Sequence, residues 1–90
     1  MTKTEYEVYL RHGDEEGEFF VDVRKDIVDS NNEIINGGEY IEGEIFDDYD
    51  KAKKRFLEFA RLYEGELRDG CSGIVNVHNE VEEEKGSITW

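Results

Sequence analysis

Carboxylates are the chemically versatile side chains that this sequence supplies in abundance. Its 90 residues include 24 Asp and Glu against 11 Lys and Arg, a formal net charge of −13. Carboxylates can ligate cations, work as catalytic acid–base pairs, or offer negative charge to a basic partner. Fifteen of the 24 stand in five groups along the chain: Glu5 with Glu7; Asp14, Glu15 and Glu16 with Glu18; Glu42 with Glu44; Asp47 and Asp48 with Asp50; and Glu80 with residues 82–84.

The spacing of these residues favours neither a metal site nor catalysis. The segment Asp47–Asp50 lacks the acidic register and the trailing Glu of an EF-hand loop, and helix capping explains it. His12, His78 and Cys71 are too few for a zinc site, which takes four ligands. Carboxylate pairs this numerous arise by chance, and no nucleophile or phosphate-loop motif is present. We therefore expect no catalytic residue, no metal and no cofactor, and hence no enzyme.

The composition argues against several other classes of protein. Apolar runs reach three residues at most, whereas a membrane-spanning helix needs about 20. No secretory signal opens the chain, and one cysteine fits a reducing cytoplasm. The negative charge disfavours direct contact with nucleic acid or with an anionic membrane. We expect a cytoplasmic protein.

The apolar residues are patterned as in a folded domain, and eleven aromatic residues argue against disorder. Alternation predicts a strand over Thr4–His12 and a second one from Glu18 to about Asp29, bent at residues 25–26. Residues 33–47 predict a third strand, interrupted at Asn36–Gly38 by a hairpin signal. Its second part places one set of residues on a single face: Tyr40, Glu42, Glu44 and Phe46.

A helix should follow, because one stripe has helical spacing: Ala52, Phe56, Phe59, Ala60, Tyr63 and Leu67. Asp47 or Asp48 is the expected N-cap, and Gly65 or Gly70 the expected end. Alternation then predicts a strand over residues 74–81, a charged turn over 82–86, and a short last strand over 87–90 with Ile88 and Trp90 on one face.

This order of elements predicts a single α+β domain over residues 1–90. We expect an antiparallel sheet of about five to six strands, with one long amphipathic helix packed on one face. A chain of this length buries a small core, so a homodimer is a further option.

Charge is divided unevenly between the helix and the strands. Residues 51–68 hold six bases and three acids, a net charge of +3, which leaves −16 for the remainder. Carboxylates two residues apart on a strand lie ~6.6 Å apart, and two such rows reach about half the charge density of duplex DNA. A groove built for phosphates would attract such a surface, since arginine binds carboxylate and phosphate alike. The basic stretch Lys51–Arg55 is either a solvated helix face or a second contact.

In size and charge, the chain resembles the small phage-encoded inhibitors of bacterial defence, the anti-CRISPR and antirestriction proteins, several of which act as DNA mimics. The resemblance extends over the whole chain without a shared motif. It implies an inhibitor in the host bacterial cell that occupies the DNA-binding groove of a CRISPR effector or restriction complex.

The candidate partner-binding residues are acidic, with tyrosines as anchors: Asp14, Glu15, Glu16, Glu18, Glu42, Glu44, Asp47, Asp48, Asp50, Tyr9, Tyr40 and Tyr49. The tyrosines could equally pack on the sheet or on a dimer mate. Two other functions stay open: an immunity protein that plugs a toxin nuclease, and a small adaptor whose charge serves only solubility.

Overall fold

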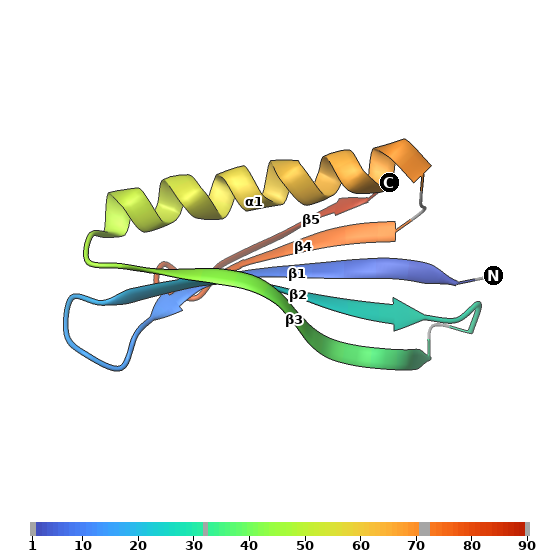
Figure 1. The fold of residues 1–90 in the computed structure, drawn as a ribbon, viewed down its shortest axis with the longest axis horizontal. Coiled ribbons are helices and arrows are strands. Elements are labelled where there is room, and N and C mark those ends of the chain that lie inside the picture. The colour runs from blue at the N-terminus through green and yellow to red at the C-terminus, as the bar shows by residue number, and fades with distance from the viewer. Residues whose placement is uncertain (1, 32, 71–72, 90) are drawn as a thin grey trace.

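In a computed structural model, one helix covers one face of a five-stranded sheet (Figure 1). The structure describes residues 2–31, 33–70 and 73–89, without the side chains of residues 68–70, 85 and 87–89. The elements in chain order are β1 (Lys3–His12), β2 (Phe19–Val28), β3 (Ile34–Phe46), α1 (Tyr49–Gly70), β4 (Gly73–Asn79) and β5 (Glu84–Thr89). The predicted α+β class is confirmed at this level.

The sheet is mixed, so the prediction of an antiparallel sheet is wrong at one pairing. The strand order is β3-β2-β1-β4-β5, and β4 lies parallel to β1, whereas the other neighbours are antiparallel. Parallel neighbours require a long crossover. The 22 residues of α1 provide one, because at 1.5 Å per residue they span about 33 Å, the length of a ten-residue strand. The helix thus returns the chain to the end of the sheet where β1 begins.

A glycine permits the close approach of the two parallel strands. Gly73 pairs with Thr4 at the start of β4. A Cβ atom built on Gly73 would lie 2.0 Å from the Thr4 carbonyl oxygen and 3.0 Å from the Leu67 side chain. Only a residue without a side chain fits this position without moving β4.

The core lies between α1 and the sheet face that the helix covers. The predicted helical stripe is confirmed, because all six of its residues are buried. All of them except Ala60 belong to one cluster with inward residues of the central strands: Tyr6, Val8, Leu10, Val21, Val23 and Val75. Within the described residues, no helix combines the length and the apolar character that crossing a bilayer requires.

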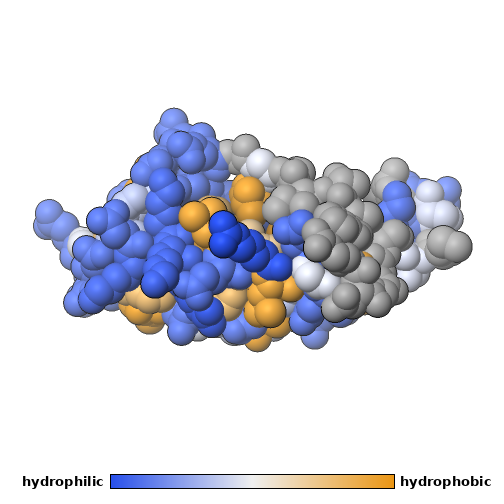
Figure 2. All heavy atoms as spheres, turned by 90° about the horizontal axis from the view of Figure 1, so that it is seen from above, coloured by the Kyte–Doolittle hydropathy of each residue, from blue (hydrophilic) through white to orange (hydrophobic). Residues whose placement is uncertain are grey.

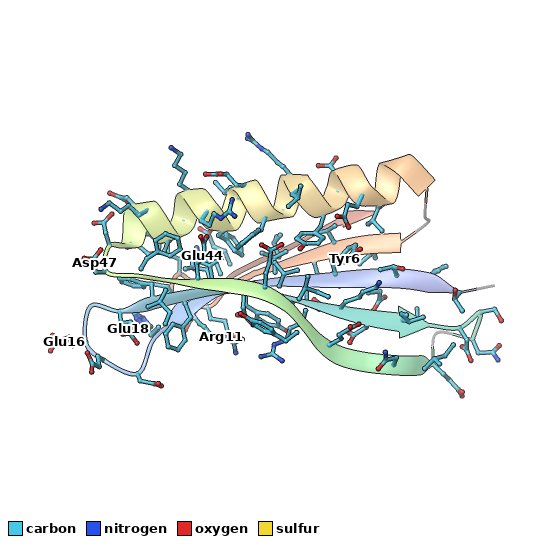
Figure 3. The ribbon with its side chains drawn as sticks, viewed as in Figure 1. Tyr6, Arg11, Glu16, Glu18, Glu44 and Asp47 are labelled. Carbon is cyan, nitrogen blue, oxygen red and sulfur yellow. The ribbon has the colours of Figure 1, made fainter. Side chains whose placement is uncertain are left out.

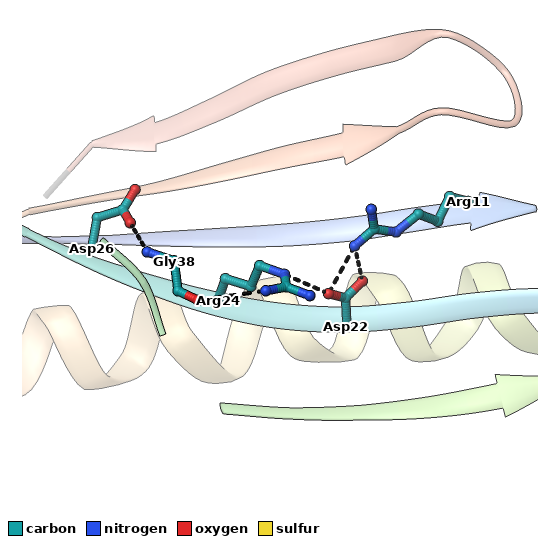
Figure 4. Close-up of polar contacts among 5 residues, drawn as sticks. All are labelled: Arg11, Asp22, Arg24, Asp26 and Gly38. Carbon is teal, nitrogen blue, oxygen red and sulfur yellow. Dashed lines mark hydrogen bonds and ion pairs between the residues drawn. The ribbon is translucent and has the colours of Figure 1, made fainter. Parts of the chain in front are cut away.

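β3 is one continuous strand, so the predicted hairpin at Asn36–Gly38 is wrong. The turn-forming residues instead accommodate an irregularity in the pairing with β2, next to the predicted bend at residues 25–26. Gly38 has a φ of 70°, and its amide donates to Asp26 Oδ1 at 2.6 Å (Figure 4). The side chain of Asp26 therefore stabilises an irregular stretch of a continuous strand, at the position where the sequence pattern predicts that the chain reverses.

A second irregularity changes the face on which Tyr40 lies. Val23 pairs with Glu42, but the next residue, Arg24, pairs with Tyr40, so that Ile41 is an extra residue in β3. Because side chains alternate along a strand, this bulge moves Tyr40 to the opposite face from Glu42. The prediction that Tyr40 shares a face with the glutamates is wrong for this reason.

The turn between the last two strands lies earlier in the chain than the charge pattern predicts. The turn after β4 spans residues 80–83, and β5 starts at Glu84 rather than at residue 87. The earlier start brings an acidic residue of the predicted turn into the strand. The prediction for the side chains of Ile88 and Trp90 lies outside the described residues.

Candidate functional site

Three acidic segments meet at one end of the molecule, termed the acidic end. They are the β1–β2 turn (residues 13–18), the β3–α1 junction (residues 47–50) and the β4–β5 turn (residues 80–84). The first two adjoin because Phe19 pairs with Phe46, and Figure 3 shows Glu16, Glu18 and Asp47 at this end. The third joins them because β4 runs parallel to β1.

The convergence of the third segment is visible in one backbone contact. The Glu80 amide donates to the Leu10 carbonyl at 2.8 Å, which places the β4–β5 turn beside the end of β1. An antiparallel β4 would have carried this turn to the opposite end of the sheet. The parallel pairing that the sequence did not predict is therefore the feature that gathers the acidic segments.

The acidic end concentrates most of the molecule's net charge. With Lys51 counted, and Lys53 because it pairs with Glu82, its eleven carboxylates leave a net charge of −9, out of −13 for the whole chain. All but the half-buried Glu18 are exposed, and hydrophilic residues cover this end at the left of Figure 2. The eleven are Asp14, Glu15, Glu16, Glu18, Asp47, Asp48, Asp50, Glu80, Glu82, Glu83 and Glu84.

Glu18 and Asp48 contribute negative charge to the acidic end and also bind backbone amides in it. The Glu18 side chain accepts the Asp14 amide at 3.2 Å, and its carbonyl accepts the Gly13 amide at 2.7 Å. Asp48 Oδ2 accepts the Lys51 amide at 3.0 Å and so caps α1, which confirms one of the two predicted caps. These two carboxylates hold the turn and the junction in fixed conformations.

Tyr49 braces the acidic end from within. Its hydroxyl donates to Glu82 and accepts from Asn79 Nδ2 at 3.0 Å, and its ring meets Phe19 edge-on at 5.6 Å. Burial, together with the hydrogen bond to Glu82, raises the pKa of Tyr49. Lys53 Nζ lies 3.8 Å from Glu82 and adds an ion pair to the same brace. Tyr49 therefore connects the β3–α1 junction to the β4–β5 turn and to the start of β2, and its hydroxyl is engaged by two hydrogen bonds.

Two of the candidate carboxylates, Glu42 and Glu44, do not belong to the acidic end. They lie on the face of β3 that α1 covers, where Glu44 pairs with Arg55 and Glu42 accepts the Tyr63 hydroxyl. Figure 3 shows Glu44 between the helix and β3. These bonds fasten α1 to the edge of the sheet rather than extending the acidic end.

Tyr63 makes the stability of this fastening sensitive to alkaline pH. Burial, and then the hydrogen bond to Glu42, raises the pKa of Tyr63 in the folded protein. Since the unfolded state loses this proton first, near pH 10, the stabilisation is complete below that pH and is lost above it. We expect the free energy of unfolding to fall above pH 10 by up to about 1.4 kcal/mol per pH unit from this group, and Tyr63→Phe to remove that slope.

Urea titrations at a series of pH values between 8 and 11.5 measure this effect. Tyr40→Phe is the matched control, because the Tyr40 side chain is 56% exposed and should leave the wild-type slope unchanged. Equal slopes for the wild type and Tyr63→Phe would contradict the role given to Tyr63.

A second polar cluster lies on the sheet face that α1 leaves uncovered, termed the open face. Arg11 Nη2 lies 2.9 Å from both carboxylate oxygens of Asp22, and Arg24 Nε lies 3.1 Å from one of them (Figure 4). Asp22 lies on the outer face of the sheet, and the two guanidinium groups leave it only 7% exposed. Pairing across β1 and β2 creates this cluster, so the linear sequence gave no signal for it.

The tyrosines of the open face are partly covered by cations and rings. Arg24 lies 5.7 Å from the centre of the Tyr40 ring, and Arg11 lies 4.8 Å from that of Tyr9. Tyr9 also stacks on His78 at 4.6 Å. The structure thus separates the three tyrosines proposed as anchors, since Tyr9 and Tyr40 lie on the open face and Tyr49 lies at the acidic end.

One group of the described residues has the geometry to hold a cation. Carboxylate oxygens of Glu5, Glu7 and Asp26 lie within 4.8 Å of one another on the open face. Glu7 is already engaged, because it meets Asn76 Nδ2 at 3.0 Å and His78 Nε2 at 2.6 Å. We assign no ion to this cluster.

Comparison with known proteins gives no family: no family model matches the sequence, and no curated protein or solved structure is similar to the chain. The likeness to phage-encoded inhibitors therefore stays a prediction.

Proposed function

We propose that this protein is an acidic inhibitor that binds the nucleic-acid-binding surface of a bacterial defence complex, such as a CRISPR effector or a restriction complex, in the cytoplasm of the host cell. The acidic end occupies the groove and competes with DNA. The observation that supports this proposal is the convergence of three acidic segments into a single surface with a net charge of −9.

The charge density of the acidic end is close to that of a nucleic acid. Neighbouring strands lie ~4.8 Å apart, so the ends of five strands span ~19 Å. Nine net charges over that span correspond to one charge per ~2 Å, against one per ~1.7 Å of axis in duplex DNA. Lysine and arginine side chains that neutralise phosphates in a groove would meet a similar density of carboxylates.

The rigidity of the acidic end adds to its suitability as a competitor. Its segments are held by the strand pairings, by the Glu18 turn, by the Asp48 cap and by the Tyr49 brace. A surface that is already ordered loses little conformational entropy on binding. Mutual repulsion among the carboxylates also decreases when a cationic partner binds, which favours the complex further.

Competition with DNA provides the direct test. Purified defence complexes are bound to fluorescein-labelled duplex, and the anisotropy is followed as the protein is added at 100 mM and at 300 mM NaCl. We expect the duplex to be released at 100 mM NaCl. Without duplex, the dissociation constant of the protein from the same complex should rise at least about tenfold between 100 and 300 mM NaCl, because the contact is electrostatic.

The outcomes of this titration separate the candidate functions. The proposal would be contradicted if no complex releases its labelled duplex when the protein is added, although unlabelled duplex does displace the labelled one. Tight binding to a nuclease that loses cleavage activity but keeps its DNA would favour an immunity protein. Binding that is indifferent to salt and to DNA would favour an adaptor.

A further inference from the structure

The edge strand β3 carries most of the large exposed apolar side chains among the described residues. It is one of the two edge strands of the sheet, the other being β5, and it pairs with β2 alone among the described strands. Seven large apolar side chains are exposed in the described part of the chain, and five belong to β3: Ile34, Ile35, Tyr40, Ile41 and Ile45. Apolar residues reach the surface among hydrophilic ones in Figure 2. An edge with free backbone groups and apolar side chains is suited to pairing with a further strand.

The charges on β3 select against a second copy of the same strand. The segment Ile34–Phe46 has no lysine, arginine or proline, and its charged residues are Glu39, Glu42 and Glu44. Self-pairing would bring six glutamates together between two molecules of charge −13, and like charges on paired strands are destabilising. A strand that carries lysine or arginine would meet opposite charge instead. The complementary occupant is therefore a basic segment of another protein.

The exposed side chains and the regular part of β3 indicate which residues a partner segment would need. Pairing with β2 is regular over Glu42–Phe46, where the strand is not bulged. Glu42 and Glu44 lie on the helix-covered face, where they bind Tyr63 and Arg55 of α1, and the Glu44 side chain is still 47% exposed beside Arg55. Ile45 lies on the open face, 67% exposed. Beside Ile45, a hollow of about 800 Å³ is lined by Phe20, Tyr40 and Gly43 and also by the ion-paired Arg11, Asp22 and Arg24. An added strand alternates its side chains between the same two faces.

We propose that β3 binds an extended segment of a partner protein in which basic and apolar residues alternate, and that this segment becomes a sixth strand of the sheet. Backbone hydrogen bonds to Glu42–Phe46 supply affinity, the basic side chains face Glu42 and Glu44, and the apolar ones lie along Ile45 and the hollow. The proposal goes beyond DNA competition at the acidic end and does not depend on it.

A heptapeptide of alternating lysine and valine, blocked at both termini, is the probe. Titrated into the full-length ¹⁵N-labelled protein, it should shift the amide signals of residues 42–46 and slow their hydrogen exchange. The same peptide with alternate amides N-methylated keeps its charge but loses donors, so it should bind at least about tenfold more weakly. Ile45→Lys should weaken the unmodified peptide at least about fivefold, whereas Leu62→Lys, on the exposed side of α1, should not.

Three results would overturn the proposal. The peptide could shift the acidic turns at residues 13–18 and 80–84 and leave β3 unchanged. The N-methylated peptide could bind as well as the unmodified one. Sedimentation of the protein alone could reveal a dimer that Ile45→Lys abolishes, which would make a second copy the occupant of β3. The DNA titration with Ile45→Lys is a separate measurement. If this variant releases DNA as the wild type does, the proposed function stands even when the strand-addition proposal fails.

Discussion

Reversing Glu16 and Glu83 to lysine together should raise the concentration that releases DNA from the target complex by on the order of 10- to 100-fold. The two residues lie in different acidic turns, both exposed, at the same end of the molecule. Each reversal removes one attraction to the groove and adds one repulsion. The measurement is the anisotropy titration with labelled duplex, at fixed salt.

A control with the same total charge separates a local effect from a general one. Glu33→Lys with Glu39→Lys also changes the net charge from −13 to −9, but its positions are exposed away from the acidic end. This pair should alter the half-release concentration less than about threefold, because charges beyond a Debye length of ~8 Å are screened. Equal losses for the two pairs would mean that net charge, rather than the acidic end, governs binding.

The structure also corrects the choice of residues for such a test. Glu18 is in the candidate set on its charge, but its carboxylate holds the β1–β2 turn by accepting the Asp14 amide. A lysine there would disturb the turn and mix a folding effect with a binding effect. Glu16 and Glu83 are exposed, so their reversal should leave the circular dichroism spectrum and the thermal midpoint close to those of the wild type.

Phe59→Ala should lower the free energy of unfolding by about 3–5 kcal/mol, the usual loss for removing a buried phenyl ring. Phe59 has no exposed surface and is the largest fully buried side chain at the helix–sheet interface. Arg55, which pairs with Glu44, also lies 4.2 Å from the centre of the Phe59 ring, so the cavity would loosen the fastening of α1 to β3. The free energy of unfolding of a small domain is about 5–15 kcal/mol, so this substitution would remove a large part of it.

Thermal unfolding followed by circular dichroism measures this loss as a fall of more than about 10 °C in the midpoint. Leu62→Ala on the same helix is the matched control, because Leu62 is 50% exposed and should cost less than about 1 kcal/mol. A loss for Phe59→Ala no larger than that for Leu62→Ala would contradict the seating of α1 on the sheet.

The sequence was sufficient wherever a local period decides the structure. The helical stripe from Ala52 to Leu67 and the alternation in β1 identify which side chains are buried, because each period depends on the geometry of one element. Capping by Asp48 follows from the same local chemistry. Local signals were misleading at Asn36–Gly38, where residues typical of a hairpin form a bulge because β3 already has β2 as its partner.

Net charge, charge order and the amphipathic helix were determined by the sequence alone. Which ends of which strands meet was decided only by the tertiary structure. The direction of β4 relative to β1 depends on how α1 crosses the sheet, and no residue of β4 encodes that direction by its spacing. Because the crossover returns the chain parallel to β1, Glu80 and Glu82–Glu84 join Asp14–Glu16 at one end, and an acidic composition becomes an acidic surface.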